Sequence, residues 1–130
     1  MDNAKSQFLK RRAMGFLEDA KSDYFRGYYD LVLFHVEQFI QLYSKYLLYR
    51  RIGDYPKTHS LTRLIRDLIK IYENCKLREF YENNLEMLYL LEEAYISSRY
   101  IPREYDKEIA KRALDFAEKV LEVLECLEKH

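Results

Sequence analysis

The sequence predicts an all-α fold, an antiparallel up-and-down bundle of about five helices, and two observations carry this prediction. Apolar side chains recur every three to four residues along most of the chain, whereas the alternation typical of strands is absent. The 130 residues include only 3 glycines and 2 prolines, so the chain has few places at which it can turn. We therefore expect a core of four long helices with one shorter helix, in a single domain over residues 1–130.

The first two helices are each expected to end at a glycine, which favours a left-handed C-terminal turn. The first helix should end at Gly27, and its apolar residues lie on one face. They are Leu9, Ala13, Phe16, Leu17, Ala20 and Tyr24. The second helix should run over residues 28–52 and end at Gly53. Its principal apolar stripe consists of Val32, Val36, Phe39, Ile40, Tyr43 and Leu47.

The second helix carries a further stripe beside the principal one. This second stripe consists of Leu31, His35, Gln38, Leu42, Tyr46 and Tyr49. Because a helix that is apolar on more than one side needs more than one partner, this helix is either central in the bundle or in contact with a second subunit. The sequence leaves both alternatives open, and these residues are the candidate dimer interface.

The remaining elements follow from turn and capping residues. Residues 53–60 contain Gly, Asp and Pro and predict a loop, in which Thr58 or Ser60 can cap a short third helix over residues 61–72. The fourth helix is expected over residues 77–98, followed by a break over residues 99–105. Asp106 can then cap a last helix with nearly heptad apolar spacing.

Composition limits the class of protein. Lys and Arg number 22, as do Asp and Glu, so the molecule as a whole does not attract nucleic acid or anionic lipid. Basic residues are in excess in the first half and acidic residues in the second, which indicates either complementary helix faces or a basic face for phosphates. No apolar run approaches the roughly 18 residues of a membrane span, and no signal segment is recognisable, so we expect a cytoplasmic protein.

The two cysteines, Cys75 and Cys126, are too few and too far apart in the sequence to predict a metal site or a disulfide. We therefore expect ordinary thiols. The chain also lacks a glycine-rich phosphate loop, a His-Glu-x-x-His motif and a Gly-x-Ser-x-Gly elbow. Neither a metal nor a cofactor is expected, and the usual enzyme classes have no support.

The segment of residues 98–105 carries the most chemical information. The guanidinium of Arg99 suits phosphate or carboxylate, and Tyr100 and Tyr105 can stack on a base or donate hydrogen bonds. Together with Lys45 and the loop histidine His59, they form the candidate ligand-binding set for a nucleotide or phosphate. The alternative is structural, with Arg99 on the last carbonyls of its helix, Tyr100 beneath the last helix and His59 bonded to a helix end.

Several segments, taken in order, resemble the HEPN domain (higher eukaryotes and prokaryotes nucleotide-binding) over residues 8–127. They are Gly27-Tyr28-Tyr29-Asp30 with Phe34, Glu37, Gln38 and Lys45 in the following helix, then Thr58-His59-Ser60-Leu61, then Ser98-Arg99-Tyr100-Ile101-Pro102. In many relatives the last element reads Arg-Tyr-Pro, so Ile101 is an insertion in this chain. The resemblance implies an up-and-down helical bundle that is usually a homodimer. In prokaryotes it is often found beside a small nucleotidyltransferase in a toxin–antitoxin pair.

The resemblance also implies a test for ribonuclease activity. Many such domains are metal-independent RNases that rely on an Arg followed, after four to six intervening residues, by a His. After Arg99 these positions hold Glu104, Tyr105 and Asp106, so the motif is absent. We therefore expect a non-catalytic protein that binds a nucleotide or RNA, or that pairs with a nucleotidyltransferase. The alternatives are a metal-independent endoribonuclease that uses His59 or His35, and a purely structural dimerisation or interaction module.

Overall fold

The computed structural model describes residues 4–100 and 103–130, and these residues form six helices and no strand. The helices are α1 (Ala4–Arg26), α2 (Tyr29–Ile52), α3 (Leu61–Ile71), α4 (Leu77–Asn83), α5 (Leu85–Tyr100) and α6 (Lys107–Glu128). The all-α prediction is confirmed. The insertion assigned to Ile101 lies outside the described residues.

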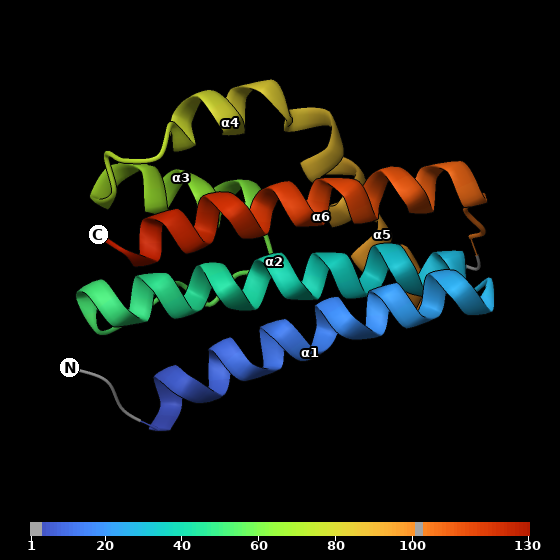
Figure 1. Ribbon diagram of the computed structural model, residues 1–130, viewed down its shortest axis with the longest axis horizontal. Helices are drawn as coiled ribbons and strands as arrows, with labels where there is room; N and C mark the ends of the chain where they lie inside the picture. Colours follow the sequence, from blue (N-terminus) through green and yellow to red (C-terminus); the bar gives the residue numbers. More distant parts are fainter. Residues whose placement is uncertain (1–3, 101–102) are drawn as a thin grey trace.

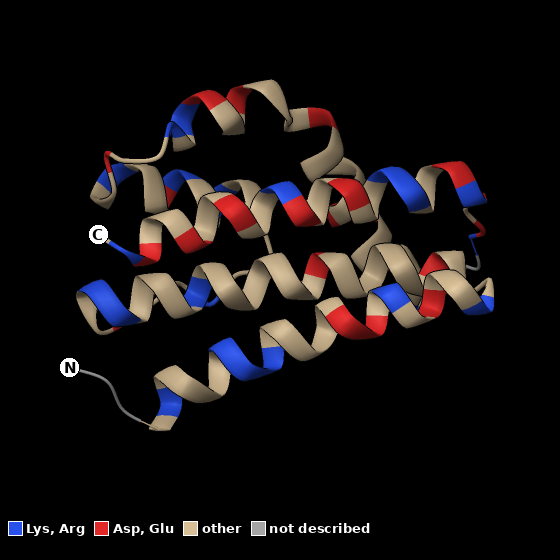
Figure 2. Cartoon of the chain, viewed as in Figure 1, with Lys and Arg blue, Asp and Glu red and all other residues tan. Residues whose placement is uncertain are grey.

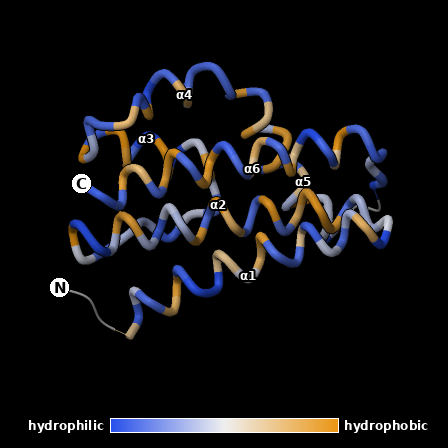
Figure 3. Tube along the Cα trace, in the orientation of Figure 1, coloured by the Kyte–Doolittle hydropathy of each residue, from blue (hydrophilic) through white to orange (hydrophobic). Residues whose placement is uncertain are grey.

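The helix α2 lies at the centre of the bundle, in contact with α1, α3, α5 and α6. Figure 1 shows α1 running antiparallel to α2 and α6 running in the same direction as α2, as in an up-and-down bundle. The short α4 lies outermost, on the side of α3. Hydrophobic and hydrophilic residues alternate along the helices (Figure 3), as expected of helices that bury one face. The second stripe of α2 therefore has partners within the chain.

The helix ends are set by the predicted capping residues. Gly27 and Gly53 have φ of 83° and 77°, and the Gly53 N–H donates to the carbonyl of Tyr49. The hydroxyl of Ser60 accepts from the Arg63 N–H at the start of α3, and the carboxylate of Asp106 accepts from the Ile109 N–H at the start of α6. Such caps satisfy donors and acceptors that a helix end leaves unpaired.

The predicted fourth helix is in fact two helices, α4 and α5, with Asn84 between them. Its φ of −130° and ψ of 23° lie outside the helical range, and its side chain donates to the carbonyl of Phe80 at 2.8 Å. A short polar side chain that bonds the local backbone competes with helix continuation, which explains the break. At its other end α5 continues through Arg99 and Tyr100, which the sequence had assigned to the following break.

The carboxylate of Glu128 joins three helices. It accepts from the hydroxyls of Tyr43 at 2.5 Å and Tyr46 at 2.8 Å, both on α2, and from Lys10 of α1 at 2.8 Å. The guanidinium of Arg50 donates to the Glu128 carbonyl at 2.6 Å. Two tyrosine hydroxyls and one lysine on this carboxylate satisfy polar atoms that would otherwise lie unpaired at the edge of the core. The end of α6 is thereby fixed against α1 and α2.

The prediction of free thiols is wrong, because Cys75 and Cys126 form a disulfide with a Cα–Cα distance of 6.1 Å. Cys75 lies in the loop before α4 and Cys126 near the end of α6, so the fold brings together residues that are 51 apart in sequence. Cys75 and Lys76 have φ of 61° and 54°, a left-handed conformation that few residues other than glycine adopt. The loop thus turns sharply where it is bonded to α6.

Basic residues gather on the N-terminal half of α1 and at the end of α2 (Figure 2). Acidic residues gather on the second half of α6. Within the described part of the chain, no helix combines the length and apolar character needed to cross a membrane.

Candidate functional site

A row of polar side chains is buried on one face of α2. Glu37, Gln41 and Lys45 are 0%, 3% and 8% exposed, and their spacing of four residues places them on the same side of the helix. The Gln41 amide donates to Glu37 at 2.9 Å, and the Lys45 ammonium donates to the Gln41 amide oxygen at 3.0 Å. Gln38 also donates to Glu37, at 2.7 Å. The row is therefore hydrogen-bonded from end to end.

Burial shifts the pKa of both ionisable groups in this row. Desolvation raises the pKa of Glu37 to about 7, against the hydrogen bonds from Gln38 and Gln41 that favour its charged form. Desolvation likewise lowers the pKa of Lys45, which Glu37 partly offsets. Near neutral pH, Glu37 therefore exists in both protonation states.

The row continues to His59, in the loop before α3. The Nδ1 atom of His59 lies 3.2 Å from the Gln41 amide oxygen and 3.2 Å from the Tyr95 hydroxyl. An amide oxygen only accepts, so a hydrogen bond to Gln41 requires the proton on Nδ1, whereas the Tyr95 hydroxyl can either donate or accept there. Neutral His59 then has its lone pair on Nε2. Burial, followed by the positive charges of Lys45 and Arg99, lowers the pKa of His59 and favours this neutral form.

The ring of Tyr95 brings His59 and Arg99 to the same place. Tyr95 is 6% exposed, and the His59 ring stacks on it with 5.0 Å between the centroids. The guanidinium carbon of Arg99, one helical turn later on α5, lies 4.6 Å from the Tyr95 centroid. A pocket of about 280 Å³ adjoins these groups and is lined by His59, Ser60, Glu92, Tyr95 and Ile96.

The loop that carries His59 is tied to α5 by Glu92. The carboxylate of Glu92 accepts from the Ser60 hydroxyl at 3.0 Å and from the Thr62 backbone N–H at 3.1 Å. These contacts add to the N-cap that Ser60 provides for α3. The position of His59 is therefore set by the helix start that follows it.

Three of the residues in the candidate ligand-binding set converge, namely Arg99, His59 and Lys45. Tyr100 is 75% exposed at the end of α5, so it does not pack beneath the last helix. Tyr105 lies elsewhere, below the guanidinium of Arg103 and beside a cavity that Gly27 and Tyr29 also line. The sequence alone did not predict the roles of Gln41 and Tyr95. The spacing of four residues between Glu37, Gln41 and Lys45 on an otherwise apolar helix could have indicated the role of Gln41.

The residues of the candidate dimer interface do not share one exposed surface. Tyr46 is 4% exposed and bonded to Glu128, whereas Leu31 is exposed. His35 is 2.6 Å from the carboxylate of Asp23 and stacks on Phe16 of α1. Gln38 bonds Glu37, Leu42 is partly buried, and Tyr49 packs against Tyr55. A contact of these residues with a second subunit stays a prediction.

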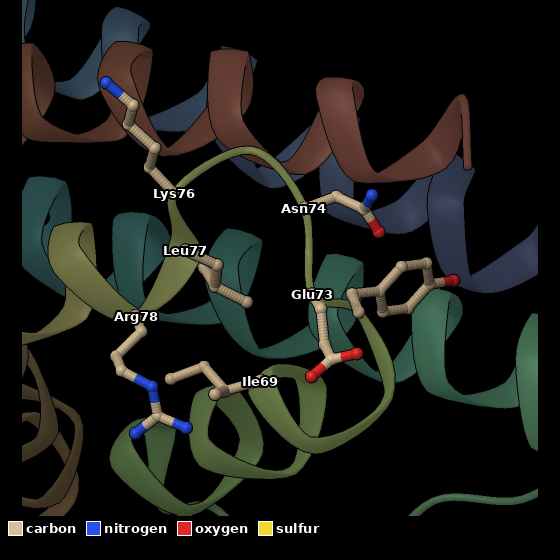
Figure 4. A pocket seen from close by; sticks show the side chains of 7 residues that line it. Ile69, Glu73, Asn74, Lys76, Leu77 and Arg78 are labelled. Carbon is tan, nitrogen blue, oxygen red and sulfur yellow. The ribbon is translucent and has the colours of Figure 1, made fainter.

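Two further places hold polar groups. A pocket of about 240 Å³ lies at the loop before α4 and is lined by Ile69, Tyr72, Glu73, Asn74, Lys76, Leu77 and Arg78. Figure 4 shows Lys76 pointing away from Glu73 and Arg78, so the charged groups that line this pocket do not converge. Nearby, the potential ligand atoms of Cys75, Cys126 and His130 lie within 4.8 Å of one another. The two sulfurs are bonded to each other and offer no thiolate to a metal.

Comparison with known proteins and protein families gives one match, to a family model. The family model of the HEPN domain matches residues 6–127, nearly the whole chain. Neither the curated proteins nor the solved structures include a significant match. The match confirms the resemblance carried by the segments around Gly27, His59 and Arg99, and the six helices agree with the helical fold of this family. The chain therefore belongs to the HEPN domain family.

Proposed function

We propose that the protein binds a nucleotide or RNA without cleaving it, at the site formed by Arg99, His59 and Lys45. Membership of the HEPN family indicates a nucleotide- or RNA-related function in general. The observation that carries the proposal is the position of Arg99, whose guanidinium lies against the Tyr95 ring on which His59 stacks. Among the described residues no carboxylate forms an ion pair with it.

The chemistry of the three groups suits a phosphate-bearing ligand. The planar guanidinium of Arg99 carries five N–H donors, enough to contact Tyr95 and still donate to a phosphate. Lys45 adds positive charge beside His59, as its effect on the pKa of His59 indicates. The lone pair on His59 Nε2 can accept a hydrogen bond from a ribose hydroxyl.

Replacement of Arg99 by alanine is expected to weaken binding of a nucleotide by tenfold or more, because a hydrogen bond to a charged group contributes about 1.5–3 kcal/mol. Titration calorimetry with ATP, other nucleotides and short RNA measures the effect. The matched control is Arg112→Ala, which removes an exposed arginine from α6 and should leave the affinity unchanged. Equal affinities of wild type and Arg99→Ala would remove the proposed site.

Metal-independent cleavage of RNA is a second candidate function, and the position of His59 near Arg99 favours it. Although the sequence lacks a histidine at the family offset from Arg99, the fold places His59 against the same tyrosine ring. The Nε2 atom would take the proton of a ribose 2′-hydroxyl, whose oxygen attacks the adjacent phosphorus. The bond to the 5′-oxygen then breaks, this oxygen takes a proton from water, and Arg99 balances the charge on the phosphate.

If this second function holds, RNA is cut in the presence of a chelator and cutting is lost in His59→Ala. Activity should fall as the pH is lowered, since protonation of Nε2 removes the base. The His130→Ala variant serves as control, because His130 is exposed beside the Cys75–Cys126 disulfide and is not part of the site. RNA that stays intact at high protein concentration would exclude cleavage and leave the binding proposal.

The wider setting is also proposed from the family. In this proposal the chain is a cytoplasmic, prokaryotic homodimer that pairs with a small nucleotidyltransferase, as in toxin–antitoxin systems. A purely structural dimerisation or interaction module is the remaining alternative. Light scattering decides whether the chain is a dimer, and a coding sequence for a nucleotidyltransferase beside that of this chain would favour the two-component system.

A further inference from the structure

We propose that the binding surface extends from Arg99 across α2 onto the N-terminal half of α1, and that it takes a single nucleic acid strand of several nucleotides. This inference rests on the proposed function, since the Arg99 and His59 site forms one end of the surface. Beyond the proposed function, the inference specifies that the ligand is a strand rather than a mononucleotide. It also assigns a second set of residues to the binding surface.

An unbroken series of ring and guanidinium contacts, which we call the cation–ring ladder, joins the two ends of this surface. Tyr95 is 6% exposed and the His35 side chain 18% exposed, so a ligand reaches the ladder mainly at its ends. Its members, in spatial order, are Arg99, Tyr95, Phe34, His35, Phe16, Arg12, Phe8 and Arg11. On α2, Phe34 stacks on Tyr95 at 5.9 Å and meets the neighbouring ring of His35 at 5.3 Å. The ladder thus connects α5 to α1 through α2.

On α1 the ladder follows one helix face. Phe16 stacks on His35 at 5.6 Å, and the guanidinium of Arg12 lies 5.8 Å from Phe16 and 5.3 Å from Phe8. Arg11 lies 5.7 Å from Phe8 on its other side. Phe8, Arg12 and Phe16 are four residues apart, which places them in one row. Rings and guanidinium groups therefore alternate along this part of the surface.

Exposure and charge show that this end of the ladder is open to a ligand. Phe8 is 44% exposed, and Arg11 and Arg12 are exposed as well. Within residues 4–100 and 103–130 neither arginine forms an ion pair. A groove of about 800 Å³ runs beside them, lined by Ala4, Gln7, Phe8, Lys10, Arg11 and Met14.

Helix stability does not explain these cations. The first acidic residue of α1 is Glu18, and all charged residues before it are basic (Figure 2). The helix dipole acts on charges in the first turn, and Arg11 and Arg12 lie about two turns into α1, so it does not account for them. Their gathering beside an exposed aromatic ring is instead the arrangement that binds single strands, in which bases stack on rings and phosphates meet cations. A duplex offers no free base faces, so a single strand fits better.

The test is a series of single-stranded homopolymers of increasing length, with a mononucleotide as the shortest member, measured by fluorescence anisotropy at several salt concentrations. Affinity should rise with length until the strand covers the ladder. Phe8→Ala should weaken the longer strands by about tenfold, as expected for loss of one stacked base, and leave the mononucleotide unaffected. Phe25→Ala, at the far end of α1 and 87% exposed, is the matched control without effect.

The contribution of positive charge to strand binding is tested with a double variant that combines Arg11→Gln and Arg12→Gln. For single strands the slope of log K against log salt falls by about 0.7 for each phosphate contact, so the double variant should lower it by about 1.4. The control combines Lys111→Gln with Arg112→Gln, which removes two adjacent exposed cations from α6 and should not change the slope. Circular dichroism shows that each variant keeps its helices.

The outcomes separate the ladder from the proposed function. If the mononucleotide binds and depends on Arg99, but longer strands bind no tighter, the ladder is overturned and the proposed function stands. If strands depend on Arg11 and Arg12 but not on Arg99, the proposed site is wrong and the binding surface is confined to α1, so the ladder as a whole is overturned. If Phe8→Ala converts a wild-type dimer to a monomer without changing strand affinity, this surface is an interface between copies and the ladder is overturned.

Discussion

Loss of the Cys75–Cys126 disulfide is expected to lower the free energy of unfolding by about 4 kcal/mol. The bond closes a loop between residues 51 apart, and the chain-entropy relation assigns about that stabilisation to a loop of this length. The effect arises because the bond restricts the unfolded chain, which otherwise gains many conformations. It is large compared with the total stability of about 5–15 kcal/mol that domains possess.

Urea denaturation of the oxidised and reduced protein measures this difference. The double variant Cys75→Ser with Cys126→Ser should unfold at the same urea concentration as the reduced wild type, and adding a reductant to it should have no effect. Titration of thiols in the native, oxidised protein should find none. Identical curves for the oxidised protein and the double variant would show that the bond contributes nothing to stability.

The wild-type protein is expected to lose about 3 kcal/mol of stability between pH 5 and pH 8 through Glu37, which is fully buried. Burial raises the pKa of Glu37 from its ordinary value of 4.5 to about 7 in the folded chain. The folded state therefore binds the proton more tightly than the unfolded state does. The resulting stabilisation is fully present below about pH 4.5 and is lost as the pH rises through about 7.

The Glu37→Gln variant separates this contribution from other titrations. Its amide cannot ionise, but it accepts one hydrogen bond fewer from Gln38 and Gln41, so at pH 5 it should be about 1 kcal/mol less stable than wild type. By pH 8 the order should reverse. Denaturation of both proteins across this range gives the difference, and Glu118→Gln on the surface is the control. Parallel pH profiles of wild type and Glu37→Gln would contradict the role of burial.

The sequence predicts the helices of this fold better than it predicts their interruptions. Gly27, Gly53, Ser60 and Asp106 act as expected, because each sets a helix end through local backbone chemistry that needs no tertiary contact. Asn84 interrupts a continuous apolar pattern, and its break depends on a bond to the Phe80 carbonyl that competes with the helix. Local patterns do not show which conformation wins such a competition.

The candidate site was predictable only in part. Arg99, Lys45 and His59 were identified because their chemistry suits phosphate and because the family pattern includes them. Tyr95 lies within the predicted fourth helix, and only the tertiary structure shows that it contacts both His59 and Arg99. The disulfide was missed for a related reason, since the distance between two cysteines along the sequence does not give their distance in the fold.

The central position of α2 determines how the domain opens. The middle of α2 is covered by α1, α3, α5 and α6, so its amide hydrogens reach water only when the whole bundle separates. By contrast α4, a helix of 7 residues, touches the fold through Leu77, the stacking of Phe80 on Phe116 and the Arg66–Tyr81 bond. Such a short, outlying helix can unfold alone. In hydrogen exchange, α2 therefore reports the cooperative unfolding of the domain, and α4 reports local opening beside it.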